Sequence, residues 1–79
     1  MKAIIGSWRN HFAKATFTAD GRVTANVMGR HSLGEWSVDA EGRLHAEIAG
    51  RREIAQASVS DNELHITLTG RVVTLARVM

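Results

Sequence analysis

The sequence lacks cysteine, proline and tyrosine, and it contains no long apolar run. Without cysteine, a stabilising disulfide and a thiolate metal site are excluded. No apolar stretch approaches the ~18 residues that cross a bilayer, and the first residues are too polar for a signal peptide. We therefore expect a cytoplasmic protein. Because the chain is shorter than a typical domain, we predict a single domain over residues 1–79.

The sequence also lacks a large excess of either charge. The formal net charge is +2, from ten basic and eight acidic residues. A basic arm for nucleic acid or a polybasic membrane anchor would need a larger excess, so we expect no membrane partner and do not expect nucleic-acid binding. Chains of about this length form marginal cores, so we expect tight packing, a metal, or association with a second copy.

Apolar residues recur at every second position between short turns, which is the pattern of strands with one buried face. Segments 22–27, 43–48 and 63–68 all show this alternation. The surrounding segments repeat at a spacing of roughly 20 residues, each reading acidic residue, glycine or asparagine, strand, Gly-Arg, strand and valine. Each copy is predicted to be a β-hairpin, and one further hairpin is expected from Ile4–Asn10 and Lys14–Thr18.

About eight short antiparallel strands are therefore predicted, and no segment has a helical pattern. The apolar face of such a meander is buried either by closure into a barrel or by pairing with a second chain. We favour an all-β fold, a small antiparallel up-and-down barrel. At this strand number, the interior is just wide enough for its own side chains or one small ligand.

The first expected strand contains Gly6-Ser7-Trp8-Arg9-Asn10, a Gly-x-Trp-x-Asn pattern. At the start of an eight-stranded meander, this pattern resembles the calycins, the group of lipocalins and avidins. In calycins the indole of a first-strand Gly-x-Trp closes one end of the barrel, and avidins add an asparagine two positions later. The resemblance implies a calycin-like fold. Lys14 stands where avidins carry a serine that contacts biotin, so biotin binding is not implied.

Two tryptophans, Trp8 and Trp36, each follow a glycine by two residues and are expected to point inward. Core packing is the simpler interpretation, because aromatic rings dominate small cores. The functional interpretation is a ligand cavity floored by the two indoles, with Asn10 of the same motif as a further candidate ligand-binding residue. Residue volumes alone do not decide between these interpretations.

Three arginines, Arg30, Arg51 and Arg71, occupy the same position in the three repeats. A closed barrel would place them around one rim, where they could bind an anionic ligand through bidentate hydrogen bonds. The alternative is that they are solvated turn residues.

Apolar residues at positions expected to face outward predict an interface with another chain. If Trp8 and Ala76 face inward, then Ile5, Val73 and Leu75 face outward, and an exposed apolar cluster usually marks a contact surface. The alternative is a strand bulge that turns Val73 or Leu75 back inside.

Catalytic and metal-binding patterns are missing from the sequence. No nucleophile stands beside a base, and His45 and His65 are expected about 10 Å apart, too far to share an ion. We predict no metal, no cofactor and no enzymatic activity. The leading hypothesis is a non-enzymatic interaction module that forms a homo-oligomer through an outer apolar face. The alternative is a barrel that binds a small apolar or anionic molecule, and weak nucleic-acid binding by the arginine rim is the third.

Overall fold

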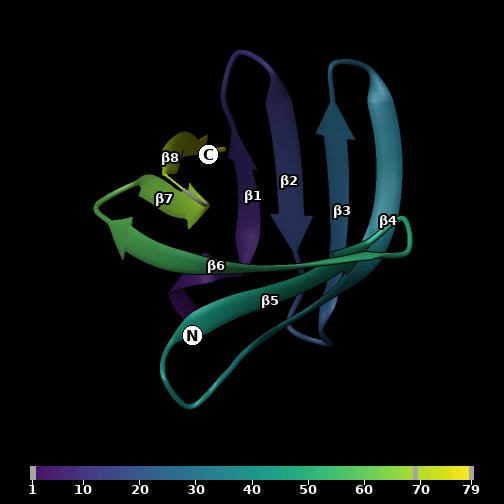
Figure 1. Ribbon diagram of the computed structural model, residues 1–79. Helices are drawn as coiled ribbons and strands as arrows, with labels where there is room; N and C mark the ends of the chain where they lie inside the picture. Colours follow the sequence, from purple (N-terminus) through teal and green to yellow (C-terminus); the bar gives the residue numbers. More distant parts are fainter. Residues whose placement is uncertain (1, 69, 79) are drawn as a thin grey trace.

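The computed structural model describes residues 2–68 and 70–78, and these form a closed barrel of eight antiparallel strands in sequence order (Figure 1). The predicted up-and-down barrel is confirmed, and β3, β5 and β7 have the bounds expected from the alternation. The elements are η1 (Lys2–Ile4), β1 (Gly6–Arg9), β2 (Ala13–Phe17), β3 (Arg22–Val27), β4 (Arg30–Val38), β5 (Arg43–Ile48), β6 (Arg51–Ser60), β7 (Glu63–Leu68) and β8 (Arg71–Arg77).

The first predicted strand is shorter than expected, because its beginning is a single turn of 3-10 helix, η1. Gly6 has a φ of 133°, a value that L side chains rarely adopt, and it bends the chain between η1 and β1. The bend returns Ile4 over the end of the barrel, where its side chain is fully buried.

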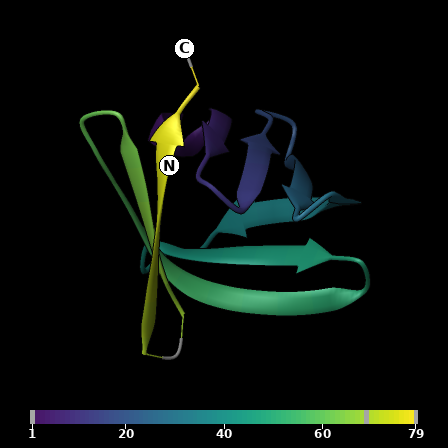
Figure 2. The same cartoon turned by 90° about the horizontal axis from the view of Figure 1, so that it is seen from above.

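The strands do not all run in one direction. β1 to β4 run up and down side by side, while β5 and β6 cross them (Figure 1), and the β5–β6 pair runs nearly across the direction of β7 and β8 (Figure 2). Gly34, in the middle of the curved strand β4, allows this change of direction. A Cβ atom built at Gly34 would collide with the backbone of Glu47 in β5, so the close approach of the two strands requires glycine.

The barrel closes through its weakest strand pair, β1 with β8. These strands pair only at Trp8↔Arg77 and Arg9↔Ala76, whereas every other neighbouring pair matches at least four residues. Beyond this point the Asn10 side chain donates a hydrogen bond of 3.4 Å to the carbonyl of Thr74. Along its β1 side, β8 therefore has no described strand partner between residues 71 and 75.

The core is concentrated at one end of the barrel, which we call the packed end. It contains η1 and the connections 18–21, 39–42 and 61–62. The opposite end, with the connections 10–12, 28–29 and 49–50, is the open end. The fully or nearly fully buried residues of the main core cluster are Ile4, Trp8, Phe17, Val23, Leu44, Leu64 and Leu75. Most of them lie next to the packed-end connections, and Trp8 lies further along β1, opposite Ala15.

The predicted outward orientation of Val73 and Leu75 is wrong. Leu75 is only 4% exposed and lies opposite Leu64, while Val73 packs against the core opposite Ile66. The third repeat is one residue shorter than the other two between Arg71 and its final valine, Val78, so aligning the valines opens a one-residue gap in β8. Because side chains alternate with a period of two, that gap reverses the orientation of every residue in β8. Without the gap, β8 keeps the same phase as β4.

Candidate functional site

A cavity of about 350 Å³ occupies the open half of the barrel interior. Its floor is made by Phe17, Val23 and Leu44, which also belong to the core of the packed end. Its walls include four alanines, Ala15, Ala25, Ala46 and Ala55. Of these, Ala15 in β2 and Ala25 in β3 are cross-strand partners. The lining residues are Ala15, Phe17, Val23, Ala25, Leu44, Ala46, Ile48, Arg51, Glu53, Ala55, Ile66 and Leu68.

The cavity follows from how inward-facing residues are distributed along the strands. Next to the packed-end connections, the inner positions hold large residues such as Phe17, Val23 and Leu44, and Trp8 and Trp36 fill the interior directly opposite Ala15 and Ala46. Toward the open end, the same face carries Ala25 and Ala46, whose methyl groups do not reach the barrel axis. An eight-stranded barrel is wide enough to leave space when its inner side chains are this small.

The mouth of the cavity carries charge. Arg51 and Glu53 begin β6 on the inner face, and their charged atoms lie 3.9 Å apart in a largely exposed ion pair. Arg30 and Arg71 begin β4 and β8, and both are exposed at the same end of the barrel. The structure therefore brings the three repeat-equivalent arginines to one rim, as the sequence analysis expected, and Arg51 lines the cavity itself.

The two tryptophans are not part of this cavity. Trp8 has no exposed surface, and its indole nitrogen donates a hydrogen bond of 2.9 Å to the carbonyl of Ile4. Trp36 packs edge-on against Phe17 and donates to the carbonyl of Thr18 at 2.9 Å. Both indoles therefore stabilise the packed half of the barrel, and the expected cavity floor of two indoles is replaced by Phe17, Val23 and Leu44.

Arg77 joins the two chain ends at the packed end. Its guanidinium lies 4.2 Å from the ring centre of Trp8, a cation–π contact. The same group donates hydrogen bonds to the carbonyls of Ala3, at 2.9 Å, and Ile5, at 3.4 Å. Ile5 thus lies at the junction of η1 and β1, half-buried, rather than on an outer strand face.

Asn10 shapes the turn between β1 and β2 instead of facing the cavity. Its side-chain oxygen accepts hydrogen bonds of 2.8 Å from the backbone N–H groups of Phe12 and Ala13. Asn26 does the same for Gly29 in the next turn of the open end, at 3.1 Å. These side-chain bonds replace backbone hydrogen bonds in tight turns and fix the turn geometry.

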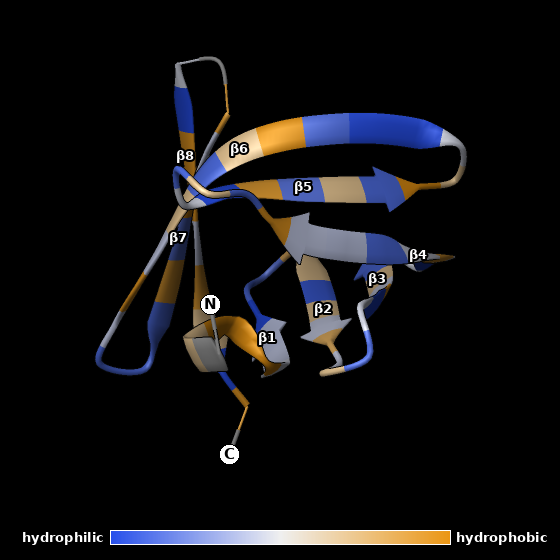
Figure 3. Cartoon of the chain, turned by 90° about the horizontal axis from the view of Figure 1, so that it is seen from below, coloured by the Kyte–Doolittle hydropathy of each residue, from blue (hydrophilic) through white to orange (hydrophobic). Residues whose placement is uncertain are grey.

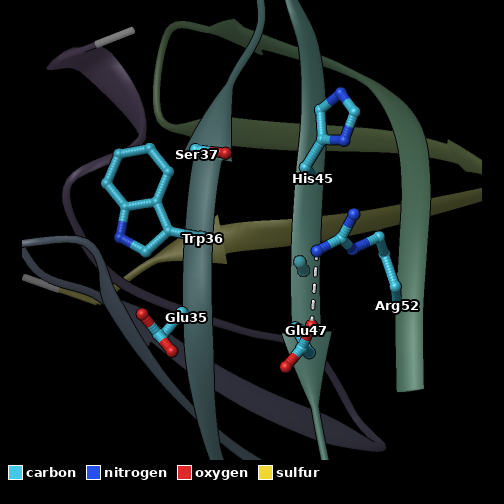
Figure 4. Close-up of a pocket in the computed structure, with 7 residues that line it drawn as sticks. Glu35, Trp36, Ser37, His45, Glu47 and Arg52 are labelled. Carbon is cyan, nitrogen blue, oxygen red and sulfur yellow. Dashed lines mark ion pairs between the residues drawn. The ribbon is translucent and has the colours of Figure 1, made fainter. Parts of the chain in front are cut away.

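A second hollow, of about 290 Å³, lies on the barrel wall across β4, β5 and β6 (Figure 4). It is lined by the polar side chains of Glu35, Ser37, His45, Glu47 and Arg52, and a 3.5 Å ion pair joins Arg52 to Glu47. Ser37 and His45 are cross-strand partners, but no hydrogen bond joins their side chains in the described structure. The arrangement therefore lacks the nucleophile–base contact that acyl-transfer chemistry needs.

Asp39, at the end of β4, orients His45. One carboxylate oxygen lies 2.8 Å from His45 Nε2 and 2.9 Å from Arg43 Nε. The hydrogen bond from His45 and that from the Arg43 backbone hold the pKa of Asp39 well below its ordinary value of 3.8. The group is a polar network at a packed-end turn, and its hydrogen bonds fix the 39–42 connection.

Of the twelve residues that line the cavity, only Arg51 was predicted as a site residue, and the four alanines Ala15, Ala25, Ala46 and Ala55 were not. The signal that could have found them is the run of small residues at inward positions of the strands nearest the open end. Among residues 2–68 and 70–78, no three histidine, aspartate or glutamate side chains are grouped so that they could hold a metal ion.

By its fold and its cavity, this protein is a small closed antiparallel barrel whose interior is hollow at one end. No protein-family model, curated protein or solved structure matches this chain. In the described part of the chain, no helix is long and apolar enough to cross a membrane. A cytoplasmic location, a homo-oligomeric state and the absence of a cofactor stay predictions.

Proposed function

We propose that this protein is a non-enzymatic binding barrel that holds one small amphiphile. The aliphatic tail occupies the alanine-lined cavity, and an anionic head group lies among Arg30, Arg51 and Arg71. The observation that carries the proposal is the apolar cavity of about 350 Å³ that opens at an arginine-bearing rim. A mostly apolar pocket with a few polar groups at one side is the usual form of a small-molecule site.

The size of the cavity limits the ligand. Its volume corresponds to roughly a dozen water molecules at about 30 Å³ each, near the lower limit for ligand pockets. An unbranched chain of about eight to ten carbons fits this space. We therefore assign the site to medium-chain aliphatic amphiphiles.

The rim favours a negative head group. Arg30, Arg51 and Arg71 begin even-numbered strands at the same end, and Glu53 is the one acidic residue that lines the described cavity. Arg51 can exchange its loose 3.9 Å contact with Glu53 for a bidentate contact with a carboxylate. A positively charged head group would instead meet an excess of like charge.

The calycin-like assignment is part of this proposal. Two features support it: the eight-strand meander closes into a barrel, and the indole of the Gly-x-Trp motif, Trp8, fills one end of it. The resemblance implies these features, and it also implies an interior that opens at the other end.

The test is a titration of the protein with butanoate, hexanoate, octanoate and decanoate by isothermal calorimetry. Each added methylene buried in the cavity contributes about 0.8 kcal/mol, so affinity should increase about fourfold per methylene and level off once the cavity is full. Octylamine should bind more weakly than octanoate, and Arg51→Gln should reduce that difference. A flat response to chain length would contradict the proposal, as would equal binding of the amine and the acid.

Self-association is a second candidate, favoured by the exposed edge of β8. Residues 71–75 have no described strand partner on the β1 side, and Val72 on this edge is 65% exposed. Such an edge can pair with the same strand of a second copy. Light scattering at micromolar concentration tests this: a dimer that Val72→Lys converts to a monomer supports edge pairing, and a monomeric wild-type protein contradicts it.

A further inference from the structure

The charges of this protein are unevenly distributed along the barrel axis. Each repeat begins with an acidic residue at the packed end and turns through Gly-Arg at the open end, so closure of the meander brings the Gly-Arg turns together at one end. The packed-end turns and their borders carry both signs, with Asp20, Asp39, Glu41, Asp61 and Glu63 against Arg22, Arg43 and Arg77. The open half carries Arg9, Lys14, Arg30, Arg51, Arg52 and Arg71 against only Glu47 and Glu53.

Several of these cations have no acidic neighbour. Arg51 and Arg52 contact Glu53 and Glu47 at 3.9 and 3.5 Å. Within residues 2–68 and 70–78, no carboxylate lies within 4.0 Å of the other four, Arg9, Lys14, Arg30 and Arg71. Figure 3 shows the part of β6 that begins with Arg51 and Arg52 in blue, as hydrophilic. A net charge of +2 therefore understates the positive potential at this end of the molecule.

The same end exposes apolar side chains, which we call the apolar rim residues: Phe12, Val27 and Met28. Their exposed fractions are 67%, 48% and 82%. They belong to two neighbouring turns, because the backbone N–H of Met28 donates a hydrogen bond of 2.8 Å to the carbonyl of Phe12. Apolar side chains thus extend from the mouth of the barrel between cationic residues.

Met28 occupies a position where the local backbone favours another residue. Its φ is 53°, in the left-handed region that suits asparagine or glycine, and its side chain makes little contact with the protein. Ala49 has the same conformation at the equivalent position of the next hairpin, with a φ of 54°, so the turn accepts residues other than asparagine and glycine. What sets Met28 apart is a large apolar side chain that is 82% exposed and that packing does not explain.

We propose that the open end docks on an anionic lipid surface, with the apolar rim residues inserted among the acyl chains and the arginines against the head groups. Charge complementarity selects this partner, since basic residues that flank exposed apolar ones are the features of interfacial membrane binding. Side chains that project from separate turns suit a deformable apolar medium. The expectation of no membrane partner rested on the small net charge and on the lack of a membrane-spanning run, neither of which excludes docking at the surface of a bilayer, and it is revised here.

This proposal depends on the rim and not on the cavity. It holds even if no amphiphile binds inside the barrel. If both proposals hold, the docked barrel presents the cavity mouth to the bilayer, so that an amphiphile can move between the membrane and the interior without crossing water.

The experiment is vesicle flotation of the full chain. Vesicles of phosphatidylcholine are compared with vesicles that contain about 30% phosphatidylglycerol, at low and at about 0.5 M salt. We expect at least about tenfold stronger binding to the anionic vesicles at low salt. Phe12→Ser combined with Met28→Asn should reduce that binding about tenfold, and Arg30→Gln combined with Arg71→Gln should remove most of its salt dependence.

Matched controls separate docking from damage to the fold. Leu33 and Ile54 are as exposed as the rim residues, at 66% and 51%, but lie on the barrel wall, so Leu33→Ser with Ile54→Ser should leave vesicle binding unchanged. Met28→Asn should raise thermal stability while it weakens binding, because asparagine suits the positive φ. Ala46→Leu, which fills the cavity, should abolish octanoate binding and keep vesicle binding.

Three results would overturn the docking proposal. They are equal binding to neutral and anionic vesicles, equal loss of binding in the wall and rim variants, and binding to a single-stranded oligonucleotide or to polyglutamate with none to anionic vesicles. Failure of octanoate binding with intact vesicle binding would overturn the proposed function alone.

Discussion

The two ends of this barrel differ in how their interior is packed: large side chains fill one end, and a cavity occupies the other. At the packed end, Trp8, Ile4 and the guanidinium of Arg77 leave no free space, and the indole and guanidinium are fixed by hydrogen bonds. At the open end, the corresponding positions are alanines around a cavity. The turns of the first end carry charges of both signs, and arginines surround the second. The difference shows that stability and binding are assigned to separate halves of a chain of 79 residues.

This division answers the problem of a small core. A chain of this length has few residues for packing, and a cavity removes still more contacts. The packed end compensates by using the largest side chains and by joining both chain ends through Arg77. A hollow half is therefore tolerated because the other half carries most of the buried apolar surface.

The largest effect is expected from loss of the indole at the packed end. Trp8→Ala should destabilise the fold by about 3–5 kcal/mol, which approaches the whole stability of a small domain. Trp8→Phe is the milder variant: it removes the N–H that satisfies the Ile4 carbonyl and should cost about 1–3 kcal/mol.

The comparison at the open end is Leu68→Ala, measured in the same urea titrations. Leu68 lines the cavity and is only partly buried, so its truncation should cost about 1 kcal/mol. A cost equal to or greater than that of Trp8→Phe would contradict the assignment of stability to the packed end.

The next prediction compares the effect on stability of enlarging an alanine that lines the cavity with that of enlarging an alanine in the core. Ala46→Leu places three more carbons in the cavity and should change the unfolding free energy by less than about 1 kcal/mol, or raise it. Ala57→Leu makes the same change where Ala57 packs against the core, and overpacking there should cost about 1–3 kcal/mol. Equal destabilisation of both variants would show that the open half is packed as well.

The smallest effect is a pH dependence at a packed-end turn. The pKa of Asp39 is lowered in the folded protein, so its contribution to stability is present above the unfolded value of 3.8 and is lost as pH falls below it. Asp39→Asn should therefore make thermal stability less dependent on pH between about 2 and 5. Asp61→Asn, at a turn where Asp61 forms no ion pair within the described residues, is the control and should keep the acid dependence.

The sequence predicted the closed meander because its alternation and its repeated turn residues agree on strand length and register. It also predicted that Arg30, Arg51 and Arg71 share a rim, since strands of the same parity begin at the same end. It did not predict the orientation of Leu75, because a one-residue gap is enough to reverse a strand. It offered a cavity only as an alternative and gave it the wrong floor, Trp8 and Trp36, because alternation shows which residues face inward but not how near the barrel axis their side chains reach. Trp8 and Ala46 both occupy inward positions, and only the structure shows that Ala46 lines the cavity and Trp8 does not.

The separation of a packed end from a hollow end is tested most directly by alanine methyl spectra. A protein with ¹³C-labelled alanine methyl groups is titrated with octanoate. The account predicts saturable shifts for the four cavity alanines, Ala15, Ala25, Ala46 and Ala55, and none for Ala19 and Ala40 at the packed-end turns. Unchanged spectra, or equal shifts at both ends of the barrel, would contradict it.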